Sequence, residues 1–235
     1  PDGEPTLDTG LEGHIDGLRA LKIPIAVITN SSLIWQPEVR QALLAADWVS
    51  LKVDAASEAV WRRVDRPHRF LRLETIVEGA SQFARAYRGC LVTETMLVAG
   101  ANDAEQELAA IADLLVQLRP QTAYVSVPTR PPAAKWVSPP TEAAVTQACQ
   151  AFGERGLRSE HLLGYEGNAF AFTGDVEQDL LSITAVHPMR EDAVTEFLAR
   201  AGADWAVIRH LLAQRELVEV EFQDRRFYLR RLRSR

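Results

Sequence analysis

The sequence predicts an α/β protein whose parallel strands curve around a polar interior, as in a full or partial (β/α) barrel, followed by a small winged-helix-like unit. Short apolar runs alternate with longer amphipathic stretches, which is typical of βα units. Polar side chains recur on one face of these runs, whereas strands covered by helices on both sides are apolar on both faces. From Met189 the pattern changes to two helical stretches and two short strands.

Four apolar runs are predicted as strands, and each is followed by a helix-like stretch. In the second run Leu51 and Val53 share one face and Lys52 and Asp54 share the other, while Glu94 lies between apolar residues in the third. Polar residues on one face indicate a curved sheet around an interior, with the site at the carboxyl ends of the strands. The runs cover residues 23–30, 47–55, 90–98 and 122–130.

Four helices are predicted in the same part of the chain. The first begins at Leu7, and the second begins at Pro37, which suits a first helical turn. The third follows Asn102 or Asp103, either of which can cap it, and the fourth covers about 141–155. The residues expected to face inward are Leu11, Ile15, Leu18 and Leu21 in the first helix and Leu108, Ile111, Leu115 and Leu118 in the third.

The remaining segments complete the predicted organisation. Because a helix is predicted from Leu7, residues 3–6 are predicted as a loop leaving a strand, and we expect the chain to lack the first βα unit of its barrel. Residues 131–140 contain four prolines and are predicted as a connector, and residues 161–174 show no clean period. The predicted domains are a barrel at 1–135, a connector and barrel-covering extension at 136–186, and a winged-helix-like domain at 187–235.

Composition limits the classes of function. The chain of 235 residues is long enough to bury a core without disulfides or metal. Its two cysteines, Cys90 and Cys149, fit no disulfide or zinc spacing, and no signal peptide or apolar run of about 18 residues occurs, so we expect a cytoplasmic protein with reduced thiols. The net charge of −6 argues against a chain devoted to binding phosphate backbones, although residues 187–235 carry ten arginines and eight acidic residues.

Two groups of polar residues are candidates for a small-molecule site. Gly3 and Glu4, followed by Pro5, form either an exposed turn or a loop that receives the ammonium group of a ligand, and Asn30 at the next strand end either caps the chain or lines the same mouth. Lys52 either forms an ion pair with Asp54 or Glu94, contacts a ligand carboxylate, or provides an amine of lowered pKa for covalent chemistry. The five histidines show no metal-binding or catalytic-triad spacing.

Six motifs in chain order resemble the radical S-adenosylmethionine (SAM) superfamily and, within it, the iron–sulfur oxidoreductases related to wyosine synthesis. The motifs are GEPTL, VITNSSLIW, SLKVDA, VDRPH, ETMLVAGAND and SVPTRPP. The resemblance spans residues 1 to about 135 and, more loosely, the tail through VHPM. A single GEPT is a weak signal, whereas six motifs in the correct order are a specific one.

The resemblance implies a partial (β/α)6 TIM-like barrel that binds SAM and a [4Fe–4S] cluster. An enzyme of this class generates a 5′-deoxyadenosyl radical for hydrogen abstraction from a substrate, which is unknown here, with RNA modification as one candidate. The implied partners are SAM and an electron donor such as a flavodoxin or ferredoxin. By matching position, the implied SAM-binding residues are Gly3, Glu4, Thr29, Asn30, Lys52, Asp54, Glu94 and Thr95, and Arg130 is the implied substrate contact.

The chain departs from the family pattern in one respect that matters for catalysis. The cluster is bound by three cysteines in a CxxxCxxC loop, and neither Cys90 nor Cys149 belongs to such a loop. No metal ligand is therefore predicted in this chain, the chain as given is expected to be inactive, and the loop is expected upstream of Pro1. Lys52, where a small polar residue is commoner in the family, is a second departure.

Two alternatives belong to other classes of function. A (β/α) barrel lyase or aldolase would use Lys52 to form a Schiff base with a carbonyl substrate. A nucleic-acid or protein-binding module would use the winged-helix-like tail, whose acidic residues are interleaved with its basic ones. The arginines available in that tail for phosphate contacts are Arg209, Arg215, Arg225, Arg226, Arg230 and Arg231.

Overall fold

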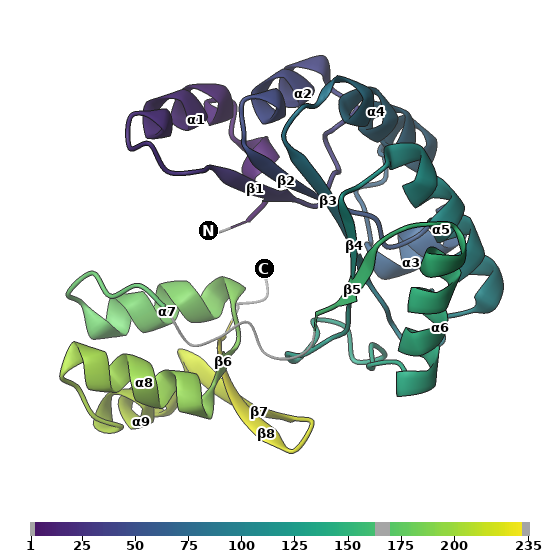
Figure 1. Ribbon diagram of the computed structural model, residues 1–235. Coiled ribbons are helices and arrows are strands. Elements are labelled where there is room, and N and C mark those ends of the chain that lie inside the picture. Colours follow the sequence, from purple (N-terminus) through teal and green to yellow (C-terminus); the bar gives the residue numbers. More distant parts are fainter. Residues whose placement is uncertain (1–2, 163–169, 232–235) are drawn as a thin grey trace. The chain divides into compact units, whose positions relative to one another are not determined.

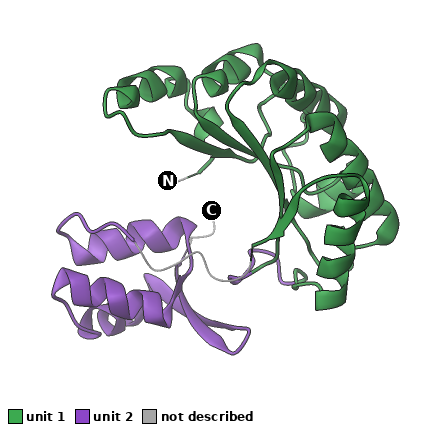
Figure 2. Cartoon of the chain, in the orientation of Figure 1, with its two compact units in different colours: residues 1, 3–128, 136–163 green, residues 2, 129–135, 164–235 purple. Residues whose placement is uncertain are grey.

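The computed structural model describes residues 3–162 and 170–231. The chain divides into two compact units (Figure 2). Among the described residues, the first unit contains 3–128 and 136–162, and the second contains 129–135 and 170–231. No helix in these described ranges has both the length and the apolar character needed to cross a membrane.

The first unit is built on a five-stranded parallel sheet in the order β1-β2-β3-β4-β5. Each strand pairs with the next one in the sequence, which is the order of a barrel wall rather than of a doubly wound sheet. The four predicted strands are confirmed, and the fifth is an addition that lies partly in the stretch without a clean period. The strands are β1 (Ala26–Thr29), β2 (Trp48–Lys52), β3 (Cys90–Met96), β4 (Thr122–Ser126) and β5 (Ser159–His161).

Helices cover one face of this sheet, along its outer, convex side (Figure 1). The core lies between the sheet and the helices and includes Val49, Leu51 and Phe83, none of which is more than 1% exposed. All four inward-facing residues predicted for α5 are confirmed as buried. The helices are α1 (Leu11–Arg19), α2 (Pro37–Leu44), α3 (Glu58–Val64), α4 (Leu73–Ala86), α5 (Glu105–Leu118) and α6 (Glu142–Glu154).

The prediction for the first helix is wrong at its start and on its inner face. Residues Pro5–Leu7 form a short 3-10 turn, and α1 begins only at Leu11. Ile15 is buried, whereas Leu18 and Leu21 are 47% and 61% exposed. The physical reason is position, because α1 packs beside β1, which has a single strand neighbour among the described residues and offers less surface to cover.

The predicted cap of the helix after the third strand is also wrong. Ala104 is the N-cap residue of α5, and it makes no side-chain capping bond. The Asn102 side chain instead accepts a hydrogen bond from Val98 N (2.7 Å) and donates to Met96 O (2.9 Å). Asp103 accepts from the amide of Gly100. Both side chains therefore stabilise the turn before the helix rather than the helix itself.

The second unit contains the two helices and the hairpin that the sequence predicts. The turn Gln223–Asp224 has positive φ at both residues, as a tight hairpin turn requires. A further helix was not predicted, and of the unassigned stretch 161–174, residues 163–169 lie outside the described residues. The elements are α7 (Val176–Val186), β6 (Met189–Arg190), α8 (Glu191–Ala201), α9 (Ala206–Ala213), β7 (Leu217–Phe222) and β8 (Arg225–Arg230), with sheet order β6-β8-β7.

Candidate functional site

The carboxylate of Glu4 ties the opening loop to the end of β1. Its Oε1 accepts hydrogen bonds from Thr6 Oγ1 (2.6 Å) and Thr29 Oγ1 (2.5 Å), and its Oε2 accepts one from Asn30 N (2.7 Å). The preceding residue, Gly3, has a φ of +131°, a conformation that glycine adopts readily and other residues rarely do. The loop therefore holds one carboxylate at a fixed place on the carboxyl end of the sheet.

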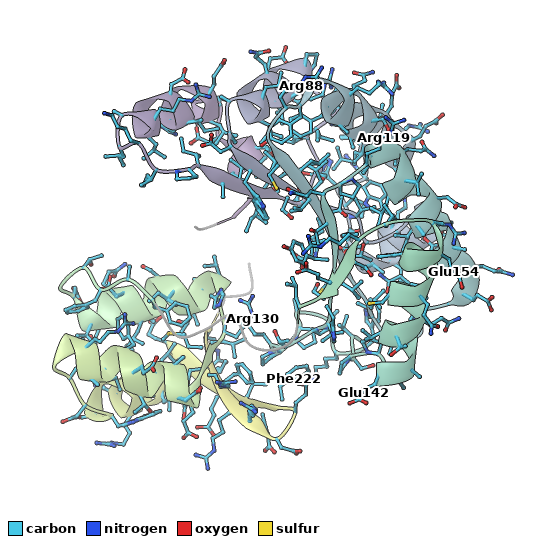
Figure 3. All side chains as sticks on the ribbon, viewed as in Figure 1. Arg88, Arg119, Arg130, Glu142, Glu154 and Phe222 are labelled. Carbon is cyan, nitrogen blue, oxygen red and sulfur yellow. The ribbon has the colours of Figure 1, made fainter. Side chains whose placement is uncertain are left out.

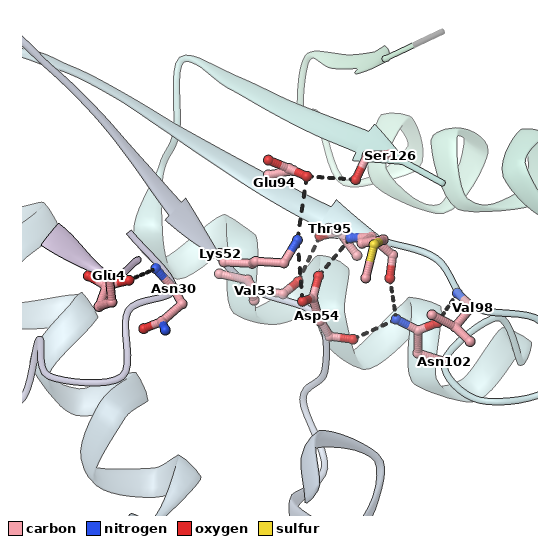
Figure 4. A network of polar contacts seen from close by, with 11 residues as sticks. Glu4, Asn30, Lys52, Val53, Asp54, Glu94, Thr95, Val98, Asn102 and Ser126 are labelled. Carbon is pink, nitrogen blue, oxygen red and sulfur yellow. Dashed lines mark hydrogen bonds and ion pairs between the residues drawn. The ribbon is translucent and has the colours of Figure 1, made fainter. Parts of the chain in front are cut away.

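Lys52 lies between two carboxylates, Asp54 just beyond the end of its own strand and Glu94 on the neighbouring strand β3 (Figure 4). Its Nζ is 3.5 Å from Asp54 Oδ2 and 3.4 Å from Glu94 Oε1, and Lys52 is directly opposite Glu94 in the pairing of β2 with β3. Glu94 Oε1 also accepts a hydrogen bond from Ser126 Oγ on β4 (2.7 Å). The polar network thus crosses three adjacent strands on the sheet face away from the helices.

The electrostatic surroundings keep Lys52 protonated. Burial alone would lower its pKa, but the charges of Asp54 and Glu94 outweigh that effect, and the pKa of Lys52 is raised above its usual value of 10.5. An amine of raised pKa is a poor nucleophile at neutral pH. Lys52 is therefore suited to pairing with an anion rather than to forming a covalent adduct.

Asp54 is held rigidly at the end of β2. It is 3% exposed, its Oδ1 accepts from Met96 N (2.6 Å), and its own carbonyl accepts from Asn102 Nδ2 (2.8 Å). Close by, the hydroxyl of Thr95 donates to Val53 O (2.8 Å), which joins the same two strand ends. Asp54 and Thr95 thus hold the ends of β2 and β3 together at the edge of the site and do not face its opening.

Asp65, at the end of α3, is the second carboxyl beside Asp54. The residue is exposed, yet desolvation of its carboxyl, followed by the charge of Asp54 and a hydrogen bond to it, raises the pKa of Asp65 to about 8. The carboxyl of Asp65 therefore keeps its proton to a higher pH than an ordinary aspartic acid does. Sequence reasoning missed this residue because it follows a helix, and strand alternation gives no signal there.

Part of this group of residues lines an open pocket of about 400 Å³ at the carboxyl end of β1, β2 and β3. Six of the nine residues predicted for the site line it, and Ile28 and Ser50, which were not predicted, complete the lining. A smaller cavity of about 30 Å³ adjoins it, since Asn30 and Lys52 line both, and this second cavity also contacts Asp54 and Asp65. The predicted residues in the larger pocket are Gly3, Glu4, Thr29, Asn30, Lys52 and Glu94.

Arg130 does not belong to this group of residues. Strand β4 ends at Ser126, four residues before it, and Arg130 lies in the second unit (Figure 3). There its Nη1 is 2.6 Å from His187 Nδ1. The assignment of Arg130 as a substrate contact stays a prediction.

The residues present do not fit an iron–sulfur cluster. Within 3–162 and 170–231, no group of three or more histidine, cysteine or acidic side chains is arranged to hold a metal ion. Cys90, at the start of β3, donates through its thiol to Gln121 Oε1, and Cys149 lies within α6. Two cysteines at separate places cannot supply the thiolates that such a cluster needs.

The pocket does fit a ligand with both charges of an amino acid. Glu4 and Glu94 offer acceptors for an ammonium group, and Lys52 offers a cation for a carboxylate. The volume is also within the range of small-molecule sites. This part of the sheet can therefore bind a zwitterion without a metal ion.

Comparisons with known proteins agree with this architecture. A domain of pyruvate-formate lyase-activating enzyme from Bacteroides vulgatus superposes with a TM-score of 0.54 at 20% identity, covering 68% of this chain and 94% of that chain. The fold is thus similar to that of radical SAM enzymes. No protein-family model matches the chain.

Sequence relatives give the family. The UPF0026 protein MJ1312 of Methanocaldococcus jannaschii is 41% identical over 236 residues, covering all of this chain and 74% of that protein. A UPF0026 protein of Helicobacter pylori is 35% identical over 132 residues, 55% of this chain and 42% of its own length. The chain belongs to the UPF0026 family.

Proposed function

We propose that this protein is a radical SAM enzyme and that the pocket formed by Gly3, Glu4, Asn30, Lys52 and Glu94 binds the methionyl end of SAM. The observation that carries the proposal is the placement of two acceptor carboxylates and one protonated lysine in a single pocket. In addition, the similarity of the fold to that of radical SAM enzymes supports the proposal. The reaction proposed for the whole protein is hydrogen abstraction from a substrate by a radical derived from SAM.

Each charged residue has a distinct role in the proposed complex. The second oxygen of Glu4, Oε2, has one backbone donor, Asn30 N, and keeps a lone pair for the ammonium group. Glu94 lines the same pocket, and its Oε1 is held by Ser126 and Lys52. Lys52 pairs with the ligand carboxylate. Because the described residues hold no cluster ligands, no step through a cluster is assigned to them.

Binding of SAM to the isolated protein tests this proposal without requiring turnover. We expect saturable SAM binding by calorimetry, weakened roughly 10- to 100-fold by Glu4→Gln, since a charge-assisted hydrogen bond is worth about 1.5–3 kcal/mol. Glu12→Gln, which removes an exposed carboxylate in α1, is the matched control and should bind as the wild type does. Absence of SAM binding in the wild type, or equal loss in both variants, would reject the proposal.

The role of Lys52 has its own test. SAM and its decarboxylated analogue differ only in the carboxylate, so the wild type should bind SAM more tightly. A Lys52→Met variant should lose most of this preference, because the cation that recognises the carboxylate is gone. An unchanged preference in the variant would place the ligand carboxylate elsewhere.

The lyase or aldolase alternative is less well supported, because it needs an amine of lowered pKa and the pKa of Lys52 is raised. Binding of nucleic acid through the tail is not favoured either. Of the six arginines named for this role, Arg226 forms an ion pair with Glu191, and acidic residues are interleaved with the others in the sequence.

A further inference from the structure

A basic and aromatic surface borders the proposed SAM pocket. Residues 61–72, from the middle of α3 to the start of α4, contain five arginines and one aspartate, although the whole protein has a net charge of −6. This segment is the basic loop. Its arginines are Arg62, Arg63, Arg66, Arg69 and Arg72, and all five are exposed.

Three of these arginines are available to a ligand. Arg62 pairs with Glu58, and Arg63 donates to Gly100 O. By contrast, no ion pair joins Arg66, Arg69 or Arg72 to any residue in the described part of the chain. The free arginines thus concentrate in seven residues, 66–72.

A structural role does not account for every one of these arginines. Arg72 is the N-cap residue of α4, and a cation at the positive end of a helix is unfavourable. Arg66 adopts a positive φ of 49°, which is uncommon for a residue with a side chain. Arg66 directly follows the C-cap residue of α3, where a cation is favourable, whereas the charge of Arg72 does not benefit the fold. A partner outside the chain is the better explanation for Arg72.

An exposed aromatic side chain lies among these charges. Phe70 is 75% exposed, the highest fraction among the large apolar residues that the structure describes. The guanidinium of Arg69 lies 4.7 Å from its ring centre, and the His68 ring lies 5.1 Å from it. Aromatic rings flanked by arginine are platforms on which the bases of single-stranded nucleic acids stack.

The basic loop lies at the same end of the sheet as the pocket. Trp61 and Asp65, both within the loop, line the small cavity together with Asn30 and Lys52, and these last two residues also line the larger pocket. The segment that carries the basic loop therefore contacts a cavity that adjoins the proposed SAM pocket.

We propose that the basic loop binds single-stranded nucleic acid, with Arg66, Arg69 and Arg72 contacting phosphates and Phe70 stacking on a base. That the bound strand is also the substrate rests on the proposed function, whereas binding itself does not. The assay below contains no SAM, so failure of strand binding and failure of SAM binding are separate results.

The test uses fluorescence anisotropy with 12-nucleotide oligo(U) and oligo(dT) across a range of salt concentrations. We expect the Arg66→Ala/Arg69→Ala/Arg72→Ala variant to lose affinity at least about tenfold, and the slope of log affinity against log salt to fall by about 2, since each phosphate contact on a single strand contributes roughly 0.7. Phe70→Ala should weaken binding roughly 5- to 150-fold with the slope unchanged, because stacking releases no counterions.

The control variant removes the same charge from the tail, through Arg209→Ala, Arg215→Ala and Arg225→Ala, three other exposed arginines. It should bind as the wild type does, and thermal melting should show that all variants remain folded. Binding of either oligonucleotide supports the proposal. No binding at low salt, an equal loss in the tail variant, or equally tight binding of a polyglutamate peptide would overturn it, the last because it would indicate an acidic protein partner.

Discussion

At the scale of single residues, the chemistry of the site follows from how charges are paired. Lys52 contacts Asp54 and Glu94 from one position, and Asp65 adds a carboxyl beside Asp54. Three carboxyls share one amine, so the least costly arrangement leaves the amine charged and one carboxyl protonated. Both consequences can be measured.

The first consequence is that Lys52 resists modification. The chain has only three lysines, and Lys22 and Lys135 are exposed. Under reductive methylation with formaldehyde and borohydride at pH 7, we expect Lys22 and Lys135 to react first and Lys52 to be protected by its ion pairs. Peptide mass spectrometry separates the three. Modification of Lys52 ahead of the others would instead support the Schiff-base alternative.

The second consequence is that Asp65 makes the stability of the folded protein depend on pH. Its pKa is about 8 in the native protein and 3.8 unperturbed, so between these values the native state holds a proton that the unfolded chain has released. Stability from this group therefore falls as pH rises from about 4 to 8. Asp65→Asn should be more stable than the wild type at pH 8, with the difference shrinking toward pH 4.

The size of this effect is limited by solvent, since Asp65 is exposed. We expect about 1 kcal/mol at pH 8, or roughly 2–4 °C in melting temperature. Asp224→Asn, a substitution in the exposed turn between β7 and β8, serves as a comparison. A difference between Asp65→Asn and the wild type that grows toward low pH would contradict the assignment.

At the scale of elements, the predicted inward faces of helices were correct in the middle of the sheet and wrong at its edge. The four apolar positions of α5 are all buried because this helix packs on the middle of the sheet. The same spacing in α1 gives one buried residue, Ile15, because α1 lies beside the edge strand β1. Spacing identifies an apolar face, but only the neighbouring elements decide whether that face is covered.

The packing of α4 gives a prediction at this scale. A Cβ atom on Gly79 would lie 2.6 Å from Ile34 O and 2.6 Å from Trp35 Cα, so the helix approaches backbone that cannot move aside easily. Gly79→Ala should therefore destabilise the protein by about 2 kcal/mol, even though alanine has a higher helix propensity than glycine. Gly153→Ala in α6, where nothing lies within 4 Å, should instead stabilise by roughly 0.5–1 kcal/mol. Urea unfolding measures both, and a stabilising Gly79→Ala would contradict this packing.

At the scale of the whole molecule, the candidate site could be predicted where its residues lie at the carboxyl ends of parallel strands. Glu4, Lys52 and Glu94 were placed together because parallel strands bring their carboxyl ends to one edge, and they line one pocket. Arg130 was assigned by the same rule, but β4 ends before it and the chain passes into the second unit. Strand patterns locate a site along a sheet, whereas they do not show where the chain leaves that sheet.

The two units have separate cores, and this gives the last prediction. Phe83 belongs to the core of the first unit and Phe197 to that of the second, and the two cores share no described residue. Truncating either buried ring to alanine costs about 3–5 kcal/mol in the unit that contains it. Phe83→Ala should lower the melting temperature of the first unit by roughly 10 °C, and SAM binding should weaken near that lowered melting temperature. Phe197→Ala should lower only the melting temperature of the second unit.

Calorimetry resolves these cases, and SAM binding at 25 °C reports on the first unit alone. If the pocket is built entirely from the first unit, Phe197→Ala binds SAM as tightly as the wild type does, even at temperatures where its second unit has melted. Loss of SAM binding together with melting of the second unit would show that the second unit is required for the site. The residues that line the pocket all come from the first unit, which is why we expect binding to persist.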